Sequence, residues 1–353
     1  MLQLNNESRF APLVQVLPDG DAVDTLYVVV RGTFTLAPSP ELDARQPLPH
    51  AADVYWGEPG ASSLKYAADV HVGKVGTDVV LVGSAHAPRG RAVTEMLAAV
   101  SVAGRRKVVR VIGDRTWRGL VGGATPPAPF VSMPLVYERA FGGRDQDSVG
   151  AGAGHPDGGV SAEERNPVGV GFRAVRRLRR GAGVRLPNLE DPQSPWRKLG
   201  DRPPPAGFGF VAPAWQPRRG YAGTYDEAWV ASRAPFLPRD FDPRFGNAAS
   251  AGLTFDEGLC GGEPIALDGV SRAERGESTL RSRVPVIRPR IEVVVAGRRE
   301  APPVKLETIL FEPDDQRMSL TWRAALRCDK RALKIERIHI RQEAGSSCRA
   351  RCS

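Results

Sequence analysis

Short runs of β-branched and aromatic residues, separated by turn signals, recur at both ends of the chain. The run TLYVVVRGTFTL at residues 25–36 is typical of a strand, and a second apolar run lies at residues 10–16. The sequence PDGD at residues 18–21 separates the two runs with residue types that favour tight turns. We therefore predict an antiparallel hairpin here.

The same pattern continues to residue 117 and returns after residue 253. The further strands predicted from it are residues 64–72, 78–87, 93–102, 107–112, 264–267, 283–287, 290–295, 306–311, 318–326 and 333–340. Short strands bounded by Gly, Asp or Arg turns favour a β-sandwich or a barrel over a helical fold.

Residues 126–252 show neither the strand period nor the helix period and are rich in Pro, Gly and Arg. We expect a long irregular region here that packs across the β-rich ends. The expected fold is therefore mainly β, with antiparallel β-sandwich-like lobes at both ends joined by this irregular middle region. The N-terminal lobe is placed at residues 1–125, the C-terminal lobe at 253–342 and a tail at 343–353, with the whole chain forming one unit.

Composition adds little to this picture. The 353 residues include 38 Gly and 31 Pro, which favours turns and short strands over long helices. The net charge of +9 suits solubility or an acidic protein partner. Nucleic-acid binding would require this charge to be concentrated on one face, so we do not expect nucleic acid as the main partner.

No residue pattern predicts a metal site, a cofactor or a covalent nucleophile. The four cysteines do not form a disulfide framework, and the five histidines lack metal-ligand spacing. The glycine pairs at residues 169–172 and 207–210 lack the Lys-Ser/Thr ending of a phosphate loop. The first residues do not resemble a signal peptide, and no apolar run approaches about 18 residues, so we expect a cytoplasmic protein that does not enter the membrane.

The segment at residues 223–247 concentrates aromatic, proline, acidic and arginine residues without periodicity. It is interpreted either as a structural belt between the lobes or as a site. Asp226 and Glu227 are adjacent, so in an extended chain their carboxylates point to opposite faces. Pairing of these carboxylates with Arg233, Arg239 or Arg244 is therefore favoured over acid/base catalysis. A hydrolase that uses Asp226 and Glu227 is kept as an alternative.

Several short motifs occur in one order along nearly the whole chain. They are YERAFGG at 137–143, RNPVG at 165–169, LPNLE at 186–190, GFGF at 207–210, GTYDEAW at 223–229, residues 233–245, GGEP at 261–264 and LTWR at 320–323. In these motifs the chain resembles the DUF2169 family, which is encoded beside type VI secretion clusters in Gram-negative bacteria. The run at residues 173–185 is more basic than the family pattern, and residues 345–353 do not follow it.

This resemblance implies a non-enzymatic adaptor or chaperone. Such a protein binds a secreted effector and helps to load it onto the spike, directly or through a PAAR-like tip protein. The resemblance carries over no catalytic residues. The residues that form the family signature in this chain are Gly223, Thr224, Tyr225, Asp226, Glu227, Trp229, Arg233, Pro238, Asp240 and Phe241.

Two further sets of residues are candidates for partner binding. The first is a basic cluster, Arg173, Arg176, Arg177, Arg179 and Arg180. It is interpreted as a solvated face or as a dock for an acidic cargo, with nucleic-acid binding through residues 173–185 as a second alternative function. The second set is Trp196 and Trp215, which lie in Pro-rich sequence that suits partner contact, whereas Trp229 is expected to fill a gap between the lobes.

Overall fold

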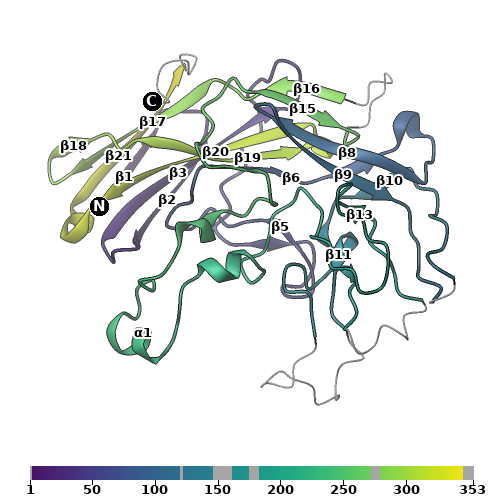
Figure 1. Ribbon diagram of the computed structural model, residues 1–353. Coiled ribbons are helices and arrows are strands. Elements are labelled where there is room, and N and C mark those ends of the chain that lie inside the picture. Colours follow the sequence, from purple (N-terminus) through teal and green to yellow (C-terminus); the bar gives the residue numbers. More distant parts are fainter. Residues whose placement is uncertain (1, 120–121, 146–160, 175–182, 272–278, 345–353) are drawn as a thin grey trace.

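Strands gather in the upper part of the molecule, and irregular segments of the middle region lie below them (Figure 1). The computed structural model describes residues 2–119, 122–145, 161–174, 183–271 and 279–344.

A six-stranded sheet forms the centre of the fold. In spatial order its strands are β14 (Thr254–Phe255), β6 (Thr77–Leu81), β19 (Val304–Glu312), β20 (Arg317–Arg327), β3 (Asp24–Thr35) and β2 (Ala11–Pro18). β6 and β19 are parallel, and the other neighbours are antiparallel. Strands from both ends of the chain are thus interleaved in one sheet.

Two smaller sheets flank this one in Figure 1. The five-stranded sheet contains β13 (Leu189–Glu190), β9 (Arg105–Ile112), β8 (Glu95–Val102), β15 (Pro264–Asp268) and β16 (Thr279–Arg283). The four-stranded sheet contains β1 (Gln3–Asn6), β21 (Ile335–Ala344), β17 (Ile287–Val295) and β18 (Arg298–Glu300). Both sheets again combine early and late strands.

The remaining elements are short. Three strand pairs are β4 (Val54–Tyr55) with β5 (Leu64–Tyr66), β7 (Ser84–His86) with β10 (Ser132–Pro134), and β11 (Phe141–Gly142) with β12 (Val170–Gly171). In the part of the chain that the structure describes, the α-helix α1 covers Glu227–Ser232. The 3-10 helices there cover Pro88–Gly90, Tyr137–Arg139, Arg218–Tyr221, Pro243–Gly246, Pro313–Asp315 and Asp329–Lys334. Among the described residues, every helix is too short to cross a membrane.

The mainly-β prediction is confirmed, and so is the first hairpin, since β2 pairs with β3 in antiparallel register. The two ends nevertheless do not form separate lobes. Residues 25–35 of β3 pair with residues 317–327 of β20. β8 pairs with β15 in the same way, so each of these sheets needs strands from both ends.

The irregular middle region contributes to the main hydrophobic core. Phe208, Phe210 and Trp215 are buried in the same cluster as Leu26 and Val28 of β3. Leu81 N of β6 donates a hydrogen bond to Phe208 O at 3.0 Å, which fixes this region against the edge of the sheet. The expectation that the irregular region packs across the sheets is therefore confirmed.

Candidate functional site

The segment at residues 223–240 projects away from the body of the protein, at the lower left of Figure 1, and we call it the arm. Helix α1 forms its far end. The Asp226 side chain caps this helix, since its Oδ1 accepts a hydrogen bond from Trp229 N at 2.8 Å. Glu227 follows in the first turn, where a negative charge is favoured by the helix dipole.

The base of the arm is closed by a contact between its two ends. Gly223 has a φ of +83°, and a Cβ at this position would meet Pro238 Cβ at 2.9 Å and Phe241 N at 3.1 Å. Thr224 donates from its backbone N and from Oγ1 to Asp240, at 3.0 and 2.7 Å. The hydrogen bond from the Thr224 backbone holds the pKa of Asp240 below its ordinary value, so the carboxylate is ionised at neutral pH.

The far end of the arm is held by its own side chains. Trp229 Nε1 donates to Phe236 O at 2.9 Å, and the ring of Tyr225 packs edge-on against that of Trp229 at 4.8 Å. Arg233 donates from Nε to Leu237 O at 2.8 Å and from NH2 to Gly20 O at 2.6 Å. The second bond joins the arm to the β2–β3 turn and limits its movement.

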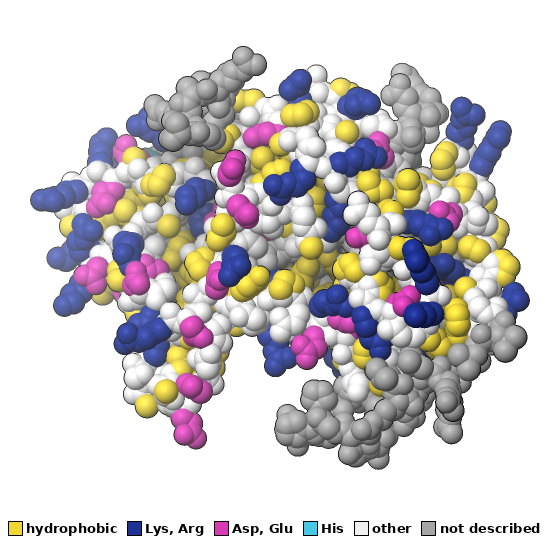
Figure 2. All heavy atoms as spheres, viewed as in Figure 1, with side chains coloured by type: hydrophobic (Ala, Val, Ile, Leu, Met, Phe, Trp, Pro, Cys, Tyr) yellow, Lys and Arg dark blue, Asp and Glu magenta, His cyan; other side chains and the backbone are white. Residues whose placement is uncertain are grey.

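Apolar side chains of the arm face solvent. Tyr225 is 53% exposed, Val230 64% and Phe236 37%. Figure 2 shows apolar and acidic side chains together on this projection, and the exposed acids there include Asp226 and Glu227. The arm therefore presents a surface that is both apolar and acidic.

The structure differs here from the sequence-based interpretation of a belt. The segment does not lie between two lobes, and Trp229 is half-buried against the arm itself rather than filling a gap between sheets. The physical reason is the local cap and the contact at the base, which give the segment a structure of its own. Of the apolar residues at the tip, Val230 and Phe236 were not singled out from the sequence.

Asp226 and Glu227 do not form the ion pairs with Arg233 or Arg244 that the sequence suggested. Arg244 pairs with Asp242, whose Oδ2 accepts from Nε at 2.9 Å and from NH2 at 2.5 Å. Arg233 bonds to carbonyl groups. Within the described part of the chain, the Asp226 carboxylate accepts a hydrogen bond only from Trp229 N, and Glu227 makes none. The hydrolase hypothesis requires a further titratable side chain beside Asp226 and Glu227. Among the described residues, no such side chain forms a hydrogen bond with either carboxylate.

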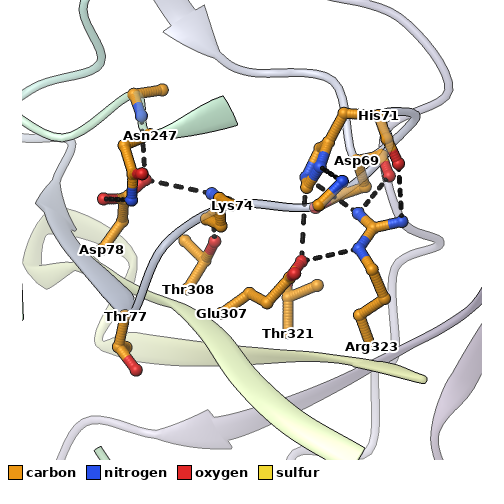
Figure 3. A network of polar contacts seen from close by, with 12 residues as sticks. Asp69, His71, Lys74, Thr77, Asp78, Asn247, Glu307, Thr308, Thr321 and Arg323 are labelled. Carbon is orange, nitrogen blue, oxygen red and sulfur yellow. Dashed lines mark hydrogen bonds and ion pairs between the residues drawn. The ribbon is translucent and has the colours of Figure 1, made fainter. Parts of the chain in front are cut away.

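The chain that returns from the arm is fixed to the sheet by a buried polar network (Figure 3). Asn247 Nδ2 donates to Asp78 Oδ1 at 3.0 Å and to Val75 O at 2.7 Å, while Asn247 Oδ1 accepts from Val75 N at 3.1 Å. Asp78 is fully buried on β6, and Lys74 Nζ lies 3.0 Å from its Oδ2. We call residues 241–247, which follow the arm, the root of the arm. This network therefore holds the root of the arm rigidly against the sheet.

The same view shows a second group of buried charges beside the first (Figure 3). Arg323 Nε donates to Glu307 Oε2 at 2.7 Å, and Arg323 NH2 donates to Asp69 O at 2.8 Å. His71 Nδ1 accepts from Gly73 N at 3.0 Å, and His71 Nε2 lies 2.8 Å from Arg323 NH2. Burial, followed by the charge of Arg323, lowers the pKa of His71 well below its ordinary value. These saturated contacts indicate a structural role.

The candidate partner-binding residues have different environments. Arg173 NH1 pairs with the buried Asp145 at 3.0 Å, whereas Arg176, Arg177, Arg179 and Arg180 lie outside the described residues.

The two tryptophans proposed for partner contact are both buried, which corrects that expectation. Trp196 packs edge-on against Trp117 at 5.3 Å in a small second core, and Trp215 packs against Tyr137 at 5.6 Å in the main core. Their large apolar rings fill the space beneath the Pro-rich loops, which in the described part of the chain form no strands or helices that could pack there.

The part of the chain that the structure describes contains no group of three or more His, Cys, Asp or Glu side chains that could hold a metal ion.

Fold and site together define a mainly-β protein with a rigidly rooted, apolar and acidic projecting arm. The chain belongs to the family described as an uncharacterized protein conserved in bacteria (DUF2169), whose profile matches residues 21–323 and so includes the arm and its root. Neither the search of curated proteins nor the search of solved structures found a match.

Proposed function

We propose that this protein is a non-enzymatic adaptor that binds a type VI secretion effector and helps to load it onto the spike or a PAAR-like tip complex. The secretion system is suggested by the family resemblance. The single observation that supports a binding role is the arm, because a projection with exposed Tyr225, Val230 and Phe236 suits contact with another protein.

The rigidity of the arm strengthens this proposal. A flexible segment loses conformational entropy when it binds, and this loss weakens association. The contacts at Gly223, Thr224 and Trp229 already order the arm in the free protein. A partner groove that is apolar, with basic residues at its rim, would complement both the exposed side chains and the acids Asp226 and Glu227.

The test is co-purification of the tagged full chain with the products of its neighbouring genes, followed by identification of any captured effector, spike or tip protein. The arm variant Val230→Asp is compared with Leu333→Asp, a control at a fully exposed apolar residue on the 3-10 helix Asp329–Lys334. We expect Val230→Asp to reduce partner affinity by about tenfold or more, since a hot-spot contact is worth about 2 kcal/mol. The Leu333→Asp control should bind as the wild type does. If the chain captures neither an effector nor a spike or tip protein, the adaptor function is rejected.

A further inference from the structure

One edge of strand β9 is open where its neighbour β13 ends. β13 pairs with β9 only at Leu189–Val111 and Glu190–Arg110, whereas β8 pairs with β9 along its whole length. Beyond Glu190 the chain turns away, and Ser194 N donates to Asp191 O at 3.0 Å. Among the described residues, therefore, no strand covers this edge of β9 from residue 105 to 109.

A cavity of about 550 Å³ lies beside this open edge, and we call it the β9 groove. Its lining comes from the β8–β9 hairpin, from residues 191–193 and 204–206, and from residues 251–252. The lining residues are Leu97, Arg105, Arg106, Lys107, Val108, Asp191, Pro192, Gln193, Pro204, Pro205, Ala206, Ala251 and Gly252. Prolines have no backbone N–H, so Pro192, Pro204 and Pro205 offer no donor to the carbonyl groups of a bound backbone.

The groove includes both faces of β9 at its edge. Successive residues of a strand point to opposite faces, so Arg105 and Lys107 lie on one face and Arg106 and Val108 on the other. Leu97 lies diagonally across from Val108 on β8 and is 55% exposed. An added strand would thus meet basic side chains on one face and a partly apolar surface on the other.

Lys107 has hydrogen-bonding capacity to spare. Its Nζ donates to Ser250 Oγ at 2.5 Å and to Ala251 O at 2.8 Å, which uses two of the three N–H groups of an ammonium. In the described part of the chain, no carboxylate lies within ion-pair distance of Nζ. Burial lowers the pKa of Lys107 to about 8, and a carboxylate placed beside it would reverse this effect.

We propose that the β9 groove binds an extended acidic peptide segment of a partner protein by strand addition. The backbone of the segment pairs with the open edge of β9, its acidic side chains contact Lys107 and Arg105, and its alternate apolar side chains pack on Leu97 and Val108. The inference deepens the adaptor function and rests on it for the identity of the partner, which would be the effector.

The probe is a fluorescein-labelled peptide of alternating Glu and Val residues, titrated with the full chain and followed by fluorescence anisotropy. A peptide of alternating Lys and Val tests charge, and the Glu–Val peptide N-methylated at alternate residues tests backbone pairing. We expect the Glu–Val peptide to bind and both comparison peptides to bind at least about tenfold more weakly. Absence of binding, or equal binding of either comparison peptide, overturns the proposal.

Protein variants locate the site. Lys107→Gln and the more exposed Arg105→Glu should each weaken binding of the Glu–Val peptide by about tenfold. The first change removes a hydrogen bond to a charged group, and the second introduces a like charge on the face that the acidic side chains contact. Lys330→Gln, at an exposed lysine outside the groove, is the matched control and should bind as the wild type does. If Lys107→Gln unfolds, the result for Arg105→Glu alone tests the proposal, since Arg105 lies at the surface. Unchanged affinity in the folded groove variants overturns the proposal, and so does equally effective competition by a single-stranded oligonucleotide.

Failure of this inference can be distinguished from failure of the adaptor function. If effector capture is unchanged in Arg105→Glu while the Glu–Val peptide does not bind, the groove proposal is rejected and the adaptor function is retained. If the peptide binds with the expected dependence on charge and backbone, but no neighbouring gene product is captured, the groove is supported as a peptide site and the adaptor function falls.

Discussion

Asn247 and Asp78 are joined by a partly buried hydrogen bond of 3.0 Å, although they lie 169 positions apart in the sequence. Oδ1 of Asp78 also accepts from Thr254 Oγ1, and Oδ2 accepts from Ala248 N and from Lys74 Nζ. The carboxylate is therefore fully satisfied, and it joins the root of the arm to the central sheet.

Asn247→Ala should destabilise the whole protein. The change removes one of the two donors to Asp78 Oδ1 and leaves the N and O of Val75 without their side-chain partners, so we expect a loss of about 2–4 kcal/mol in the free energy of unfolding. Urea unfolding measures this loss. Asn5→Ala, at an exposed asparagine, should change the same free energy by less than about 0.5 kcal/mol. A loss in Asn247→Ala no larger than in this control would contradict a supporting role for the network.

Stability should fall between neutral and mildly acidic pH because of His71. Burial and the charges of Arg323 and Lys74 lower the pKa of His71 well below its ordinary value. In the unfolded chain a histidine titrates near pH 6.5. Below that pH the unfolded state binds a proton that the folded state does not, so the free energy of unfolding decreases by up to about 1.4 kcal/mol per pH unit for this residue.

Urea unfolding at about pH 7.5, 6.5 and 5.5 measures this dependence. His71→Gln keeps an acceptor for Gly73 N and should show a shallower loss of stability below pH 6.5 than the wild type. His50, whose pKa burial also lowers, contributes to the slope in both proteins. His339→Gln, at a partly exposed histidine, is the control for a histidine change outside this network. Parallel curves for the wild type and His71→Gln would refute the assignment.

Asp226→Ala should loosen the arm without unfolding the body. Loss of an N-cap costs about 1 kcal/mol locally, and α1 is only six residues long. Hydrogen exchange of the Trp229 and Val230 amides should become faster, while the melting temperature stays within a few degrees of the wild type. Glu227→Ala is the control, since its side chain makes no cap hydrogen bond to these amides. Equal exchange rates in the two variants would show that the cap is unimportant.

Trp196 should tolerate phenylalanine much better than alanine. Its ring is buried in the second core against Trp117, yet among the described residues no acceptor bonds to its Nε1. Trp196→Phe removes an unsatisfied N–H and should cost less than about 1.5 kcal/mol, whereas Trp196→Ala should cost about 3–5 kcal/mol. Thermal or urea unfolding measures both values. Equal losses in the two variants would mean that the indole N–H contributes to stability.

Local patterns in the sequence predict individual strands and the turns between close neighbours. The sequence VAGR at residues 102–105 has the residue types of a hairpin turn, and β8 and β9 form this hairpin with positive φ at Ala103 and Gly104. The pairing of β3 with β20 was not predictable in this way. An alternating pattern identifies a strand but does not specify which distant strand completes the sheet.

The arm and the groove were harder to predict for different reasons. The cap was present in the sequence as Asp226 followed by residues that form α1, but adjacent carboxylates suggested ion pairs instead. The β9 groove has no local signal, because it exists only where Pro192 and Pro204 approach Lys107 in the folded chain.

The position of β3 between β2 and β20 also determines when the protein can fold during translation. β3 has been synthesised once residue 35 is added, but its second neighbour is complete only at residue 327. At a translation rate of about 5–20 residues per second, synthesis of β20 is complete roughly 15–60 seconds after that of β3. During this time β3 lacks its second neighbour. Any fragment that ends before β20 lacks half of the hydrogen-bonding partners of β3, so the chain cannot be divided into an early and a late half that each fold alone.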